Sequence, residues 1–306
     1  MGKEKLSKEQ KEEILKISDR YTSSELAKMY NCSRSLILKI WMDNNYKKGT
    51  NNMYYVDKYY FNNINSPSKA YVLGFIASDG TVYKRNGHSG LIQIKLKESD
   101  EQILKDILKD MESTYPVNHV KNGSFNQVVI SITSQDLYEQ LLNIGIKQNK
   151  TWNLKLKDIL SHIPTEYQID FIRGYFDGDG YIGELCNDKI SKVRISFACP
   201  YDFGLDLQKY LKEMYDINSS IHLEKHKNFT KPFCDVVING AVDKYNLLKL
   251  MYYKNDCLCL KRKSDRAKKL INAIELNVTN RAENKKAVNK FNSIDNIIHI
   301  CFNIIN

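Results

Sequence analysis

Residues 71–80 read Tyr-Val-Leu-Gly-Phe-Ile-Ala-Ser-Asp-Gly, and 100 residues later positions 171–180 read Phe-Ile-Arg-Gly-Tyr-Phe-Asp-Gly-Asp-Gly. In both stretches a glycine precedes an aspartate by five positions, and a second glycine follows the aspartate directly. The first stretch is apolar or small on nearly every side, which is typical of a helix buried all round. A recurrence of this whole context predicts a chain built from two copies of one unit.

The same series of elements is expected after each copy, because apolar and polar residues alternate with period two where strands are predicted. In the first unit, strands are predicted over 81–85, 91–97, 117–121 and 127–132, with helices over 100–111 and 135–143. In the second unit, strands are predicted over 181–185, 193–199, 220–224 and 233–238, with helices over 202–214 and 243–251. Each unit is therefore αββαββα, and the fold class is α+β with two pseudo-twofold repeats.

The small residues of the repeated helix predict how the two copies meet. Gly74 and Ser78 are four residues apart, and so are Gly174 and Gly178. Small residues at that spacing let two helix backbones approach closely. Gly74 and Gly174 are therefore expected to pack the two repeated helices against each other.

An aspartate ends each of these helices, Asp79 in the first and Asp179 in the second. Gly80 and Gly180 come next and suit the left-handed position that follows many helices. Packing the helices side by side brings the two carboxylates together. That arrangement is unfavourable by itself, because like charges meet at the negative ends of two helix dipoles.

A divalent cation resolves this conflict. Carboxylate and carbonyl oxygens suit Mg²⁺, with Mn²⁺ as a substitute. The expected ligands are the side chains of Asp79 and Asp179 and the backbone oxygens of Ser78 and Gly178. Two carboxylates sharing metal ions are equipped for phosphodiester displacement. The alternative is two solvated aspartates in turns, which the duplication of the whole context disfavours.

The stretches 72–80 and 172–180 resemble the nine-residue signature of the LAGLIDADG homing endonuclease family, and the resemblance covers about residues 57–275. It implies one chain with two motifs, a saddle of two four-stranded sheets that grips DNA, and Mg²⁺-dependent cutting of both strands. Asp79 and Asp179 would carry the metal ions. Asp177 stands opposite Ala77 and is not counted as catalytic.

Basic and polar side chains supply the remaining candidates. Lys150 and Lys263 resemble basic positions late in each family repeat. Together with Lys95 and Arg194 they are candidates for polarising the scissile phosphate. The outward strand positions expected to contact DNA are Gln93, Lys95, Lys97, Arg194 and Ser196. The alternative for each is an ordinary solvated residue.

The first 45 residues predict a helix–turn–helix module. Ser7 and Thr22 are suited to cap helices over 8–17 and 25–30, and a turn at 31–33 precedes a third helix over 34–41. The third helix would present four residues to a major groove: Ser33, Arg34, Ser35 and Lys39. The alternative is a small three-helix packing unit.

The chain is accordingly divided into five parts. Residues 1–45 form the helix–turn–helix domain, 46–56 a polar linker, 57–160 the first repeat, 161–275 the second repeat, and 276–306 an extension without an assigned role.

Composition narrows the class of protein. The net charge of +10 and the pI near 9.0 favour a polyanionic partner. No apolar run approaches the ~18 residues that span a bilayer, so no membrane association is expected. The N-terminus lacks an apolar signal segment, and 7 scattered cysteines argue for a reducing compartment. A cytoplasmic location is therefore expected.

These observations predict a free-standing, site-specific endonuclease that hydrolyses double-stranded DNA at a long asymmetric site. It is expected to be a monomer with no obligatory protein partner. An intein is disfavoured, because the chain begins with Met and lacks a terminal His-Asn. Two alternatives stay open: a non-cutting DNA-binding regulator on the same scaffold, and an RNA maturase that helps an intron splice.

Overall fold

The computed structural model describes residues 6–18, 20–44, 46, 54–123, 125–148, 153–186, 189–224, 232–253 and 256–280. The chain divides into two compact units. The smaller contains residues 1–57 together with 111–116, and the larger contains 58–110 and 117–306.

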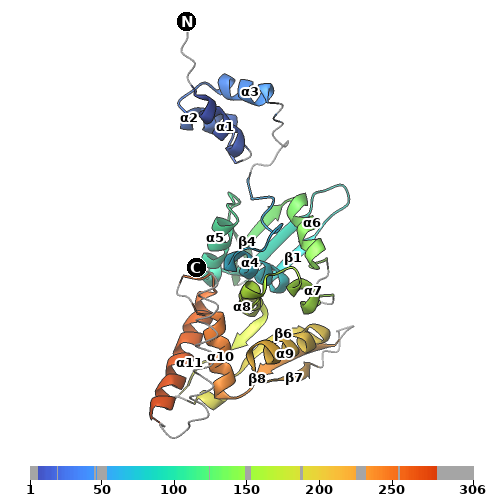
Figure 1. The fold of residues 1–306 in the computed structure, drawn as a ribbon, viewed down its shortest axis with the longest axis vertical. Coiled ribbons are helices and arrows are strands. Elements are labelled where there is room, and N and C mark those ends of the chain that lie inside the picture. Colours follow the sequence, from blue (N-terminus) through green and yellow to red (C-terminus); the bar gives the residue numbers. More distant parts are fainter. Residues whose placement is uncertain are drawn as a thin grey trace. The chain divides into compact units, whose positions relative to one another are not determined.

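The described residues of the smaller unit form three helices, α1 (Lys8–Ile17), α2 (Ser23–Met29) and α3 (Arg34–Asp43) (Figure 1). Ser7 and Thr22 begin α1 and α2 with capping boxes, as their sequence predicts. Leu26 and Ile37 are fully buried between the helices. Asn31 holds the turn between α2 and α3 with a positive φ of 46°, a backbone conformation that asparagine tolerates.

The larger unit contains the two predicted repeats. The elements of the first repeat are α4 (Pro67–Ser78), β1 (Gly80–Tyr83), β2 (Leu91–Lys97), α5 (Glu101–Asp110), β3 (Asn118–Asn122), β4 (Phe125–Thr133) and α6 (Gln135–Ile144). After the short α7 (Leu156–Leu160), the second repeat comprises α8 (Gln168–Asp179), β5 (Gly180–Ile182), β6 (Ile195–Pro200), α9 (Tyr201–Tyr215), β7 (Ser219–Glu224), β8 (Phe233–Ile238) and α10 (Ala241–Met251). A further helix, α11 (Lys261–Asn280), follows and crosses the expected domain boundary at 275.

Each repeat folds into one antiparallel four-stranded sheet. The strand orders are β1-β2-β4-β3 and β5-β6-β8-β7. In β2 the alternating residues Ile92, Ile94 and Leu96 are buried, whereas Lys95 and Lys97 are exposed. The predicted αββαββα repeats and α+β class are thus confirmed.

Helices α4 and α8 form the junction between the repeats (Figure 1). A Cβ atom added to Gly74 would lie 2.1 Å from the carbonyl oxygen of Phe171, and one added to Gly174 would lie 2.1 Å from that of Tyr71. Backbone therefore lies directly against backbone, and only glycine fits at these two positions. The structure gives Gly74 and Gly174 the packing role that the sequence predicts.

The expected reason for Gly80 and Gly180 is wrong. Neither has a positive φ; Gly180 is extended, with φ −87° and ψ 157°. A Cβ atom at Gly80 would lie 2.6 Å from the carbonyl oxygen of Ile76, and one at Gly180 would lie 2.2 Å from the ring of Phe176. These glycines are required by lack of space and not by left-handed backbone.

Across the described part of the chain, no helix combines the length and apolar character that crossing a membrane requires.

Candidate active site

The ends of α4 and α8 lie in contact and carry one aspartate each. Asp79 caps α4, and Asp179 is the last residue of α8. A Cβ atom at Gly178 would lie 2.0 Å from Ser78 Oγ and 3.2 Å from the backbone nitrogen of Asp79. Both aspartates are half-buried. The packing that Gly74 and Gly174 permit therefore continues to the helix ends.

Both carboxylates act electrostatically on the same neighbour. Burial raises the pKa of Tyr175 well above its ordinary value, and the negative charges of Asp179 and Asp79 raise it further. Tyr175 lies in the middle of α8, and its hydroxyl donates to the carbonyl oxygen of Ala198 on β6 at 3.2 Å. The two acids thus share one electrostatic environment at the junction of the repeats.

Lys263 lies at the end of α8, next to the backbone on either side of Asp179. Its side chain comes from the first turn of α11 and is only 3% exposed. Its ammonium donates to backbone carbonyls at the end of α8. Burial lowers the pKa of Lys263 to about 8, although the carboxylates of Asp177, Asp79 and Asp179 oppose that change. The predicted approach of Lys263 to the phosphates is not tested by the structure, which shows its side chain buried and its ammonium bonded to these carbonyls.

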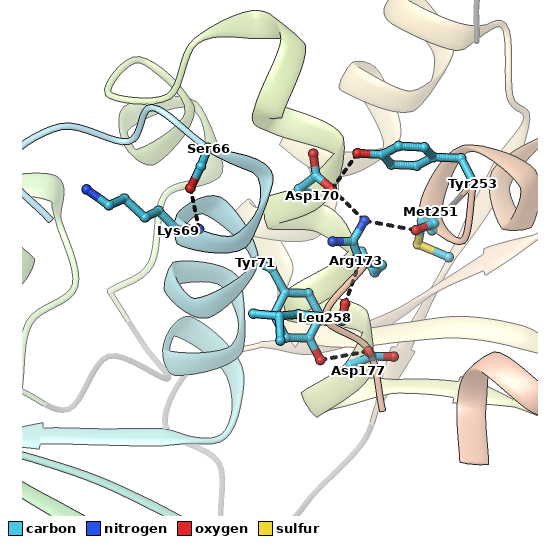
Figure 2. A network of polar contacts seen from close by, with 9 residues as sticks. All are labelled: Ser66, Lys69, Tyr71, Asp170, Arg173, Asp177, Met251, Tyr253 and Leu258. Atoms are coloured by element: carbon cyan, nitrogen blue, oxygen red, sulfur yellow. Dashed lines mark hydrogen bonds and ion pairs between the residues drawn. The ribbon is translucent and has the colours of Figure 1, made fainter. Parts of the chain in front are cut away.

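Asp177 is the acid that sequence reasoning set aside, and it is fully buried in α8. Its carboxylate accepts hydrogen bonds from the hydroxyls of Tyr71 at 2.8 Å and Tyr252 at 2.7 Å, and from the backbone nitrogen of Leu260 at 2.6 Å. Figure 2 shows the bond from Tyr71, which joins α4 of the first repeat to α8 of the second. The available signal was an aspartate at the position where the first copy carries Ala77.

A second buried network lies one turn earlier on α8 (Figure 2). Arg173 is fully buried and pairs with Asp170 at 2.5 Å. It also donates to the carbonyl oxygens of Met251 and Leu258, each at 3.0 Å, and the hydroxyl of Tyr253 contacts Asp170 at 3.3 Å. These bonds attach the segment between α10 and α11 to α8. Through that segment they help to fix where α11 begins, and hence where Lys263 lies.

Comparison with known proteins identifies this part of the chain. Residues 166–251 match the family model described as the LAGLIDADG-like domain. The second repeat is thus similar to LAGLIDADG-like domains.

Two relatives come from Methanocaldococcus jannaschii. Uncharacterized protein MJ0398 is 23% identical over 228 residues, which cover 69% of this chain and 73% of the relative. Uncharacterized protein MJ1054 is 27% identical over 136 residues, which cover 42% of this chain and 14% of that larger relative.

Solved structures with a similar fold are homing endonucleases. The homing endonuclease I-WcaI bound to its DNA recognition sequence gives a TM-score of 0.46 at 18% identity, over 68% of this chain and 91% of that chain. The LAGLIDADG meganuclease I-AabMI bound to uncleaved DNA gives 0.44 at 15% identity, over 75% and 97%. I-DmoI in complex with DNA and Ca gives 0.40 at 17% identity, over 62% and 91%.

The strand residues predicted to contact DNA fall into two groups. Lys95 and Lys97 are exposed on β2, and Gln93 donates to Ser131 Oγ at 3.0 Å. Arg194, just before β6 of the second repeat, pairs with Asp235 at 2.5 Å.

Ser196 does not have the expected surface. It is only 2% exposed, and its hydroxyl lies 3.4 Å from Nε of Arg194. The expectation of a solvent-facing Ser196 is therefore wrong, and its contact with DNA stays a prediction.

Of the helix–turn–helix residues predicted to contact DNA, two form hydrogen bonds within the smaller unit. Ser33 caps α3 by accepting from the backbone nitrogen of Leu36, and Arg34 donates to Ser23 Oγ at 3.0 Å. Ser35 and Lys39 are exposed on α3. Lys150 lies outside the described residues, as does most of the extension that begins at 276.

The helix ends suit a hard divalent cation in charge and chemistry. Asp79 and Asp179 supply two carboxylates that remain partly accessible. Gly178, a predicted carbonyl ligand, already accepts a bond from Lys263 at 3.2 Å, and Ser78 is only 8% exposed. Within the described residues no group of three or more His, Cys, Asp or Glu side chains is arranged to hold a metal ion. A Mg²⁺ ion bound through one or two carboxylates, with water and substrate phosphate completing its shell, matches this donor set.

Proposed function

We propose that this chain is a divalent-metal-dependent, site-specific endonuclease that hydrolyses both strands of duplex DNA. One observation carries the proposal: the ends of α4 and α8 touch, and each bears a half-buried aspartate. A stability argument alone does not favour two acids at the negative ends of two helices. A metal site for phosphodiester chemistry accounts for both of them.

Asp79 and Asp179 would hold Mg²⁺, or Mn²⁺ as a substitute. When bound, the metal would supply activation of the attacking water and stabilisation of charge on the leaving oxygen. Because each repeat contributes one acid, a single chain contains the whole site and can act as a monomer. Lys95 and Arg194 would contact the DNA backbone near the scissile phosphates.

The sheets and the helix–turn–helix module would hold the DNA. Lys95, Lys97 and Gln93 lie on the face of β2 opposite its buried residues. Ser35 and Lys39 on α3 are available to a major groove. Phosphate contacts would supply affinity that falls with salt, and base contacts would supply sequence choice. Because the repeats differ in sequence, the recognised site would be asymmetric.

The test is cleavage of a plasmid library that carries randomised insert sequences, with Mg²⁺ or with chelator. Wild type should convert a subset of plasmids to linear DNA only with metal. Asp79→Asn and Asp179→Asn should each lower cleavage by at least roughly a hundredfold while retaining DNA binding, because each removes a metal-binding charge. Glu213→Gln, an exposed charge change on α9, serves as the matched control.

Sequence-specific binding by wild type with no cleavage would contradict the proposal and favour the non-cutting regulator. Tighter binding to structured intron RNA than to duplex DNA would favour the maturase. Retention of both acids argues for the nuclease over the regulator.

A further inference from the structure

The ends of α4 and α8 concentrate negative charge in a place that water reaches only in part. Each helix ends with an aspartate, and the last carbonyls of each helix carry the negative end of its dipole. Charges of one sign held this close destabilise the fold that holds them. A positive charge at this place would offset that repulsion even when no metal ion is bound.

The ammonium of Lys263 places a positive charge at the end of α8. It donates to the carbonyl oxygens of Phe176 at 2.6 Å, Asp177 at 2.8 Å, Gly178 at 3.2 Å and Gly180 at 2.5 Å. An ammonium has three protons, so the four oxygens form a shared cage around it. These carbonyls lie on both sides of Asp179 in the chain.

The charges around Lys263 are mostly negative. Asp177 is the strongest of them, and Asp79 and Asp179 act more weakly from the helix ends, while Arg262 opposes them from the same turn of α11. Arg262 is itself paired with Asp100 at 3.0 Å. The net environment of the ammonium is therefore anionic.

Asp177 fixes the position of Lys263 through the backbone of Leu260. The backbone nitrogen of Leu260 donates to the Asp177 carboxylate at 2.6 Å, and the backbone nitrogen of Lys263 donates to the carbonyl oxygen of Leu260 at 2.9 Å. The first turn of α11 is thereby tied to the last turn of α8. This leaves the lysine little freedom to swing out toward DNA.

We propose that Lys263 is a resident counter-cation, a positioning residue that neutralises the end of α8 so that Asp79 and Asp179 can lie together before metal binds. The metal part of this inference rests on the proposed function; the part that concerns the metal-free protein does not. Lys263 would not touch substrate. It would keep the Asp179 carboxylate in place, with the Gly178 carbonyl occupied by the ammonium.

The first experiment compares Lys263→Met with Lys261→Met in the full-length chain, by thermal unfolding in chelator. Lys261 is 88% exposed on the same helix and serves as the matched control. Lys263→Met should lower the unfolding midpoint by roughly 10 °C, because four carbonyls and the neighbouring acids lose their cation. Lys261→Met should leave it nearly unchanged. An unchanged midpoint in Lys263→Met would overturn the proposal.

The second experiment separates a charge role from a merely structural one. Asp179→Asn added to Lys263→Met should raise the midpoint above that of Lys263→Met alone, because it removes the charge left without its cation. If Lys263→Met does not fold in chelator, the double variant should restore a cooperative transition. The proposal is overturned if Asp179→Asn gives no rise, or if neither variant folds.

Binding of Mn²⁺ to the metal-free proteins, followed by electron paramagnetic resonance, gives the third measurement. Lys263→Met should bind Mn²⁺ more tightly than wild type, by roughly tenfold, because a nearby positive charge is gone. Weaker or equal binding would count against the counter-cation role. If wild type binds no Mn²⁺ at all, the proposed nuclease function fails, and the unfolding comparison in chelator still decides the role of Lys263.

Discussion

Among single residues, Asp177 connects α8 with three other segments of the larger unit. Burial raises the pKa of its carboxyl above the ordinary value, and the bonds from Tyr252, Leu260 and Tyr71 together with the charge of Lys263 work against that rise. Those donors come from α4, from the end of α10 and from the start of α11. These hydrogen bonds support a structural role for Asp177.

Replacing Asp177 tests this assignment. Asp177→Asn keeps the shape but turns one oxygen into a donor that faces other donors, so the free energy of unfolding should fall by about 3 kcal/mol. Urea unfolding followed by circular dichroism measures it. Asp158→Asn, an exposed change on α7, is the control. Equal midpoints for Asp177→Asn and wild type would show that the carboxylate holds nothing together.

At the scale of elements, the crossing of α4 and α8 decides the architecture. Every residue of α4 from Ala70 to Ser78 is buried, so this helix has no solvent face to adjust. The contact is between backbones, which cannot rotate away as side chains can. Any added volume there must move a whole helix.

Gly174→Ala is therefore expected to destabilise the protein by about 3 kcal/mol or more, the upper end for overpacking, because the methyl group meets the Tyr71 carbonyl. Gly183→Ala is the matched control, since its nearest neighbour would lie at 3.4 Å. Chemical denaturation measures both. A Gly174→Ala midpoint equal to that of the control would mean that the helices do not pack this closely.

Helix α3 permits a prediction about binding. Lys39 is exposed in the middle of α3, the helix that the sequence predicts to enter a major groove. If it contacts a phosphate, Lys39→Ala should weaken binding to all sequences alike and reduce the salt slope by about 1. Lys16→Ala on α1 should change neither. Fluorescence anisotropy across a salt series measures the slope, and identical slopes for wild type and Lys39→Ala would exclude a phosphate contact.

How far the sequence predicted these elements depends on where each signal lies. A strand with one buried face has apolar and polar residues in alternation along its sequence. The bounds of β2 were therefore predicted correctly at 91–97. A buried helix against another leaves small residues at fixed spacing, which identified Gly74 and Gly174. No sequence pattern indicated where the side chain of Lys263 lies, because its partners are backbone carbonyls up to 87 residues away in the chain. Backbone acceptors have no side-chain identity to read.

At the scale of the whole chain, contacts between side chains of the described residues join the repeats in addition to the helix crossing. Tyr71 of the first repeat bonds Asp177 of the second, and Asp100 of the first pairs with Arg262 of α11. Neither Tyr71 nor Asp177 has the same residue at the equivalent position of the other copy, where Phe171 and Ala77 stand. The sequence repeat predicted the pseudo-symmetry but not this asymmetry, since the two copies of the motif were aligned for what they share.

We expect the asymmetric link to respond to a paired change. Tyr71→Phe should cost about 1 kcal/mol in wild type and less in an Asp177→Asn background, because the acceptor it serves is already altered. A double-mutant cycle by urea unfolding measures the coupling. Strictly additive effects would mean that the hydroxyl and the carboxylate do not depend on each other.

The hydrogen bond between Tyr71 and Asp177 also determines which repeats can associate with each other. By the repeat spacing, Phe171 and Ala77 occupy the mirror positions. A second repeat that dimerised with its own copy would offer Asp177 a phenyl ring in place of a hydroxyl, and a first repeat doing so would leave its tyrosine facing a methyl group. The contact thus disfavours a homodimer of either repeat and favours the pairing of the two different repeats. Two separately expressed repeats would therefore assemble as a heterodimer.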